Sequence, residues 1–124
     1  LGQLNLEYIL TSNPKIYIAT GVDAFRGRGV VLGKDISATE ARESIKKRIS
    51  DQVLSELTSV KTGQVYGLWH YFYASPFNIL AAEAVAKWSH PALFKDVSPD
   101  ASLKELNQKF LSVPMTGTYF ISIK

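Results

Sequence analysis

The sequence predicts an α/β domain, a three-layer αβα arrangement in which helices cover both faces of a small, mainly parallel sheet. Two apolar runs, 15–20 and 64–69, are rich in β-branched and aromatic residues, as buried strands are. A long amphipathic segment separates the two runs. A strand, a helix and a second strand in this order form a βαβ unit, in which the two strands run parallel.

The composition is that of one globular domain and excludes several other classes of protein. The chain has 124 residues, of which 46% are hydrophobic, and a net charge of +3. A chain of this length buries about two-thirds of its unfolded surface, which excludes a disordered or collagen-like chain. The absence of cysteine excludes disulfides and thiolate metal sites. The charge is too small for a typical nucleic-acid-binding domain, and the apolar stretch 79–88 is shorter than the ~20 residues of a membrane crossing.

The first part of the chain predicts a short helix followed by a strand. Helical spacing of apolar residues covers 4–11, where Asn5 is placed to cap the first free amides and Asn13 with the following proline ends the helix. The strand 15–20 then ends at Gly21. Residues 21–35 contain four glycines and form an irregular excursion with at most one very short strand at 30–32.

A long helix is predicted to follow this excursion. Ser37 and Glu40 have the spacing of a capping box, in which the serine oxygen accepts from a backbone amide and the glutamate side chain reaches back to the cap. One apolar stripe extends this helix to about residue 57, and its members are Ala38, Ala41, Ile45, Ile49, Val53 and Leu57.

The next predicted helix begins at Ser75-Pro76 and ends before Pro91, because proline is tolerated only in a first helical turn. This helix is apolar nearly all round, apart from Glu83 and Lys87, whose spacing suits an ion pair. We therefore expect it to be largely buried.

Two further elements complete the predicted domain. Ser102 and Glu105 form a second capping box, which opens a short helix whose inward residues are Leu103, Leu106 and Phe110. Residues 116–123 are expected to form an edge strand or an extended tail.

Candidate binding residues follow both strands of the βαβ unit. Arg26 and Arg28 come after the first strand, and His70, Tyr71 and Tyr73 come directly after the second. Because parallel strands open at the same edge of a sheet, we expect the two loops to meet there. Guanidinium groups suit carboxylate, catecholate or phosphate oxygens, imidazole and phenolate can ligate ferric iron, and aromatic faces cover planar ligands. The same residues are also compatible with solvated arginines and packed aromatic rings.

The glycine-rich stretch 27–34 does not match a nucleotide-binding motif. A phosphate loop needs glycine in place of Arg28 and serine or threonine in place of Asp35, and a dinucleotide fingerprint needs glycine in place of Leu32. The sequence also has no nucleophile elbow, no zinc-protease motif and no carboxylate pair with catalytic spacing. An enzyme is therefore unsupported; the alternative is a small α/β enzyme domain that binds a phosphate-bearing substrate through Gly27–Lys34.

The order of four passages resembles a known family. These are the helix and strand of 4–19 with their Asn-Pro, Val-Lys-Thr-Gly-Gln-Val-Tyr at 60–66, Trp-His-Tyr-Phe-Tyr-Ala-Ser-Pro-Phe-Asn at 69–78, and Ala-Lys-Trp-Ser-His-Pro-Ala-Leu-Phe at 86–94. Together they resemble the ABC-transporter substrate-binding proteins for iron–siderophore, haem and cobalamin complexes. Lys15 departs from the pattern, in which an aspartate is usual, and the 25–34 excursion is longer than in many members.

The resemblance implies that residues 1–124 are the C-terminal lobe of a two-lobed periplasmic binding protein whose N-terminal lobe lies upstream. It implies a non-enzymatic protein without a resident cofactor, which carries a ferric complex between its lobes. Arg26, Arg28, His70, Tyr71 and Tyr73 would then contact the ligand.

The resemblance also implies partners and a location. Glu7 matches a glutamate that docks onto the membrane permease, which works with an ATPase. The protein would be periplasmic or lipid-anchored at the outer face of the cytoplasmic membrane. The sequence begins with Leu1 rather than methionine, so we expect a cut or processed chain, in which open strand edges favour self-association.

Overall fold

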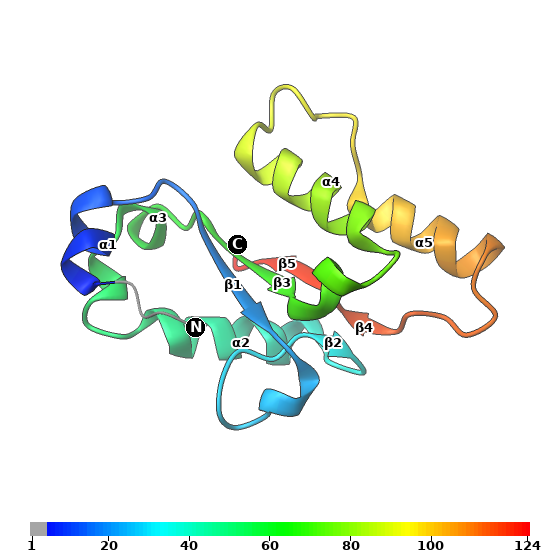
Figure 1. Cartoon of the computed structure of the whole chain (residues 1–124), viewed down its shortest axis with the longest axis horizontal. Coiled ribbons are helices and arrows are strands. Elements are labelled where there is room, and N and C mark those ends of the chain that lie inside the picture. Colours follow the sequence, from blue (N-terminus) through cyan, green and yellow to red (C-terminus); the bar gives the residue numbers. More distant parts are fainter. Residues whose placement is uncertain (1–4) are drawn as a thin grey trace.

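The computed structural model describes residues 5–124 and contains five α-helices and five strands. The helices are α1 (Leu6–Ser12), α2 (Ala38–Ile49), α3 (Thr58–Lys61), α4 (Asn78–Ser89) and α5 (Pro99–Lys109). The strands are β1 (Tyr17–Gly21), β2 (Gly33–Lys34), β3 (Val65–Trp69), β4 (Gly117–Thr118) and β5 (Phe120–Ser122) (Figure 1). Short 3-10 turns, η1 (Asp23–Phe25), η2 (Leu54–Glu56) and η3 (His70–Ala74), connect them. No helix within residues 5–124 has the length and apolar character to cross a bilayer.

The main sheet has the order β1-β3-β5 and is mixed. β1 and β3 run parallel, with Tyr17 opposite Val65 and Gly21 opposite Trp69, as the βαβ pattern predicts. β5 is antiparallel to β3, and β2 and β4 form a separate antiparallel pair. The predicted edge strand 116–123 is thus confirmed but divided between two sheets, and the sheet is mixed rather than mainly parallel. The apolar pattern of a strand does not encode its direction.

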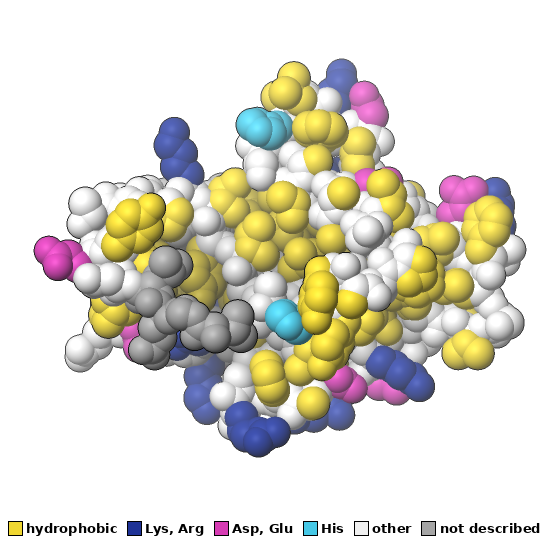
Figure 2. All heavy atoms as spheres, in the orientation of Figure 1, with side chains coloured by type: hydrophobic (Ala, Val, Ile, Leu, Met, Phe, Trp, Pro, Cys, Tyr) yellow, Lys and Arg dark blue, Asp and Glu magenta, His cyan; other side chains and the backbone are white. Residues whose placement is uncertain are grey.

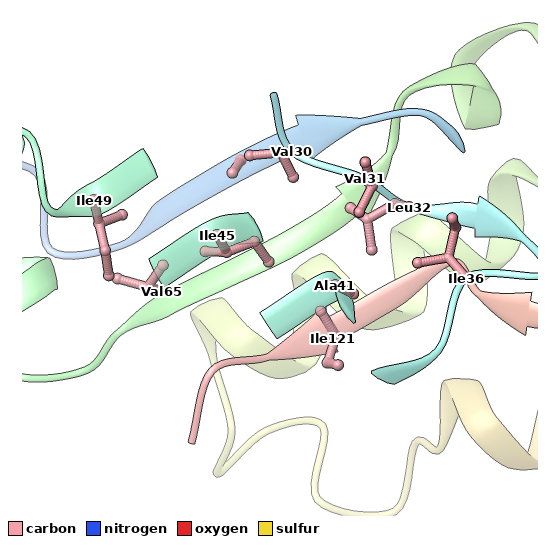
Figure 3. Packing of buried hydrophobic residues seen from close by; sticks show 10 residues of the cluster. Val30, Val31, Leu32, Ile36, Ala41, Ile45, Ile49, Val65 and Ile121 are labelled. Carbon is pink, nitrogen blue, oxygen red and sulfur yellow. The ribbon is translucent and has the colours of Figure 1, made fainter. Parts of the chain in front are cut away.

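Helices cover both faces of the main sheet, so the predicted αβα arrangement is confirmed. α2 packs on one face, where the buried residues are Ala19, Val30, Val31, Leu32, Ile36, Ala41, Ile45, Ile49, Val65 and Ile121 (Figure 3). α4 and α5 lie on the other side of the strands (Figure 1), around a second core of Phe72, Leu80 and Tyr119. Successive residues of β3 point to opposite faces, because Val65 belongs to the first core and Leu68 packs on the second.

The cap predicted for the first helix is confirmed. The side chain of Asn5 accepts a hydrogen bond from the backbone N–H of Glu7 at 2.9 Å. Asn13 ends α1 in the left-handed conformation, with φ 40°. Leu4, the first residue of the predicted helix, lies outside the described residues.

The long central helix is shorter than predicted and ends at Ile49. Its predicted stripe residues Val53 and Leu57 lie beyond it, although Leu57 is still buried. Asp51 explains the end of the helix, since its Oδ1 accepts from the backbone N–H groups of Val53 at 3.0 Å and Leu54 at 3.4 Å. This side chain starts a separate turn, and a stripe of apolar residues continues across the break.

Only half of the predicted capping box forms at the start of α2. Oγ of Ser37 accepts from the backbone N–H of Glu40 at 3.1 Å, as predicted. The carboxylate of Glu40 does not reach back to the cap, because it pairs with Arg26.

The predictions for α4 need three corrections. The helix begins at Asn78, because Oγ of Ser75 accepts from the backbone N–H of Phe77 at 3.1 Å and forms a turn before it. The helix is not largely buried: only Leu80 and Ala84 are buried. The predicted pair of Glu83 with Lys87 does not form, because Nζ of Lys87 donates to the carbonyl of Val97 at 2.6 Å.

The last helix begins earlier than predicted. Ser98 is the cap of α5, with Pro99 in the first turn, so Ser102 lies inside the helix and its predicted capping box is wrong. Proline fixes the backbone of a first helical turn and therefore outweighs the later serine. The two leucines of this helix pack in the second core as predicted, but Phe110 is 71% exposed, which contradicts its predicted inward position.

Candidate functional site

The two loops that were predicted to carry the site do begin side by side. The last residues of the parallel pair, Gly21 in β1 and Trp69 in β3, are register partners. η1 follows the first strand and η3 follows the second. The carboxyl edge of this pair therefore carries both sets of predicted binding residues, as expected for two parallel strands of a βαβ unit.

Three predicted residues come together on η3. The ring of His70 lies 5.5 Å from that of Tyr71 and 5.4 Å from that of Tyr73, both in edge-to-face geometry. Both phenols face solvent, with Tyr71 47% and Tyr73 73% exposed. We call His70, Tyr71 and Tyr73 the η3 cluster. The cluster exposes one imidazole and two phenol groups to solvent, and none of the three side chains is buried in a core.

The side chain of Trp69 packs against this cluster. Its ring lies 5.6 Å from that of Tyr71 and makes edge-to-face contacts with two buried rings, Phe72 at 5.4 Å and Tyr119 at 5.2 Å. Gly33, with φ +121°, lies against the indole, and a Cβ at this position would be 2.8 Å from Nε1 of Trp69. The sequence placed Trp69 at the end of the second strand and did not identify this glycine contact, which no local pattern encodes.

Arg26 is held at the start of α2. Its Nε donates to Oε1 of Glu40 at 2.7 Å, and its Nη2 donates to Oε2 of Glu40 at 3.3 Å and to the carbonyl of Asp35 at 3.2 Å. The hydrogen bond with Glu40 raises the pKa of Arg26, and it lowers the pKa of Glu40 below its ordinary 4.5. Arg26 therefore stays exposed at the edge of the site, but Glu40 already compensates much of its charge.

Arg28 makes different contacts from those of Arg26. Its Nη2 donates to the carbonyl of Ala24 at 3.3 Å, and its side chain lines a hollow together with Lys47 and Arg48 of α2. Among residues 5–124, no hydrogen bond or ring contact joins either Arg26 or Arg28 to the η3 cluster. The structure thus brings the three η3 residues together, while the contacts of the two arginines among residues 5–124 are made with other groups.

Glu7 lies far from this edge in the fold. It is exposed in the first turn of α1, whose chain leads into the opposite end of β1 (Figure 1). Its carboxylate makes no ion pair with residues 5–124.

The side chains of residues 5–124 do not form a group of three His, Asp or Glu that could hold a metal ion. Within the described chain, the imidazole and the two phenols of the η3 cluster lie together without a neighbouring group of this kind.

Comparisons with known proteins support this architecture. No protein-family model and no curated protein matches the chain. Among solved structures, the TroA-like periplasmic binding protein FepB from Veillonella parvula matches 99% of the chain with a TM-score of 0.91 and 30% sequence identity. The predicted resemblance to periplasmic binding proteins is confirmed. The chain spans 36% of the length of that protein, so it is similar to one part of such a binding protein.

Proposed function

We propose that this chain is the C-terminal lobe of a two-lobed, substrate-binding component of an ABC importer that captures an iron complex. The η3 cluster carries the proposal, because it places an imidazole and two phenols at the carboxyl edge of a parallel strand pair. Ligands of open α/β folds bind beyond this edge. The likeness to a TroA-like periplasmic binding protein supports a substrate-binding role for the whole protein.

The residues of the site have separate proposed roles. Tyr71 and Tyr73 cover the ligand with their faces and phenol groups, and His70 supplies a nitrogen donor. Arg26 faces an anionic chelate with the donors that Glu40 leaves unused. Arg28 was also predicted to contact the ligand, but it lines a hollow with Lys47 and Arg48 rather than with the η3 cluster, so we assign it no role in the cleft.

Delivery follows from closure of the two lobes. A ligand that bridges both lobes stabilises the closed arrangement by its higher affinity for that state. The closed protein then presents Glu7, exposed on α1, to the permease, whose ATPase drives import. The protein would work in the periplasm or as a lipid-anchored protein at the outer face of the cytoplasmic membrane.

The alternative of a phosphate-binding enzyme loop has less support. The backbone N–H groups of Arg28 and Gly29 both donate to the carbonyl of Phe25, so these amides are not available to cradle a phosphate. Gly33 and Lys34 pair with β4, and α2 begins only at Ala38. A phosphate loop instead leads directly from glycine-rich turn to helix.

Ligand titration of the two-lobed protein tests the site. Ferric siderophores, haem and cobalamin are each added while tryptophan fluorescence is followed, because Trp69 contacts Tyr71. Tyr71→Ala and Tyr73→Ala should each weaken the affinity for the bound complex about tenfold, which corresponds to about 1.4 kcal/mol. Tyr8→Ala is the matched control, since this exposed tyrosine lies on α1. Equal losses of affinity in Tyr71→Ala and Tyr8→Ala would contradict the assigned site. So would unchanged fluorescence with every ligand tested.

An uptake assay tests the docking role separately. Glu7→Gln should reduce import into cells while the affinity of the purified protein for its ligand stays unchanged. Full import by this variant would remove Glu7 from the proposed docking contact.

A further inference from the structure

A hollow lies away from the η3 cluster, between the loop after β1 and the second half of α2. Its volume is about 390 Å³, and its wall carries Arg28, Lys47 and Arg48. A neighbouring hollow of about 470 Å³ shares Arg28 and Arg48 with it. In Figure 2, Lys and Arg side chains gather at the bottom of the view, where the loop after β1 lies in Figure 1. We call the hollow lined by Arg28, Lys47 and Arg48 the α2 basic groove.

The three cations of this groove have no carboxylate partner within residues 5–124. The neighbouring cations differ: Lys46 pairs with Glu43 at 3.1 Å, and Arg26 pairs with Glu40 at 2.7 Å. Asp51 is the acidic residue in the wall; its Oδ1 accepts from two backbone N–H groups at the start of η2, and its negative charge offsets one of the three positive charges. The groove therefore holds an excess of positive charge.

The helix dipole explains only part of this arrangement. Lys47 and Arg48 lie in the last turn of α2, where a cation is favourable in any helix. Arg28 comes from a separate loop, and the bond from its Nη2 to the carbonyl of Ala24 holds it beside the other two cations. Three exposed like charges repel one another only weakly in water, and an oxyanion in the groove would relieve that repulsion.

We propose that the α2 basic groove binds a phosphate-type oxyanion. Two guanidinium groups suit the paired oxygens of such an anion, and the lysine adds a point charge. Side chains rather than glycine amides form this site, because the backbone N–H groups of Arg28 and Gly29 are already bonded. The volume has room for more than one phosphate group, so inorganic pyrophosphate is the suitable ligand to test.

Pyrophosphate titration of the 124-residue chain at low ionic strength, followed by amide NMR shifts, tests the proposal. We expect saturable binding, with shifts centred on residues 27–29 and 47–51. Arg28→Gln and Arg48→Gln should each weaken the affinity about tenfold, because each removes a charge-assisted hydrogen-bonding group. Lys46→Gln is the matched control, since it also removes one positive charge, from a residue that is next to Lys47 in the chain but does not line the groove. It should change the affinity less than about twofold.

Several outcomes would overturn the proposal. Equal loss of affinity in Lys46→Gln and Arg48→Gln would show general attraction to a basic surface, and absence of saturation would show that no site exists. Binding to anionic phospholipid vesicles without binding to pyrophosphate would assign the surface to a membrane instead. If Arg28→Gln fails to fold, Lys47→Gln replaces it with the same expected loss. Tyr71→Ala should leave pyrophosphate binding unchanged, which separates this groove from the proposed ligand cleft.

Discussion

Replacing Gly33 with alanine tests whether the contact of this glycine with Trp69 supports the η3 cluster. Gly33 has φ +121°, and an added Cβ would lie 2.8 Å from Nε1 and 3.0 Å from Cδ1 of the indole. The rings of Phe72 and Tyr119 also contact the indole edge-to-face, which limits how far it can move. A positive φ costs an alanine about 1–2 kcal/mol, and overpacking adds about 1–3 kcal/mol. We therefore expect Gly33→Ala to lower the free energy of unfolding by about 2–5 kcal/mol.

Gly27→Ala is the control for this variant. Gly27 also has a positive φ, +77°, but no atom lies within 4 Å of the position that its Cβ would take. It should therefore lose only about 1–2 kcal/mol, the cost of the backbone conformation alone. Urea unfolding followed by far-UV circular dichroism measures both values, and the difference should move the midpoint by about 1 M. If the two variants unfold at the same urea concentration, the indole contact does not constrain Trp69, and the argument fails.

Three further predictions concern the pair at the start of α2, the core and the last helix. The pKa of Glu40 is lowered by Arg26, so the pair stabilises the fold above the ordinary pKa of 4.5, and this contribution is lost as the pH falls through the lower, folded value. Glu40→Gln should therefore destabilise the chain at pH 7 but not at pH 2, and an equal effect in thermal unfolding at both pH values would contradict the pairing. Leu32→Ala should cost about 2–5 kcal/mol in urea unfolding, since this side chain is fully buried, and a loss below about 1 kcal/mol would mean that the site collapses freely. Ser98→Ala should cost about 1 kcal/mol by removing the cap of α5, while Ser102→Ala should have almost no effect; the reverse order would restore the capping box predicted from the sequence.

Local patterns in the sequence determined most of the elements and brought the candidate binding residues to one edge of the sheet. The βαβ order placed the ends of β1 and β3 together, because a parallel pair with a helical crossover leaves little other choice. The predicted grouping of His70, Tyr71 and Tyr73 followed from their positions directly after the second strand. These features depend on neighbours along the chain, and periodicity and capping residues report such neighbours.

Contacts between distant segments decided what the sequence could not. Glu40 has the spacing of a capping residue, yet its carboxylate binds Arg26, which the fold brings to the start of α2. Arg28 stands two residues further on and turns to Lys47 and Arg48 instead of the η3 cluster. The direction of β5 and the contact of Gly33 with Trp69 likewise depend on residues far apart in the chain. Long-range electrostatics and close packing fix these choices, and a one-dimensional pattern of apolar and polar residues does not contain them.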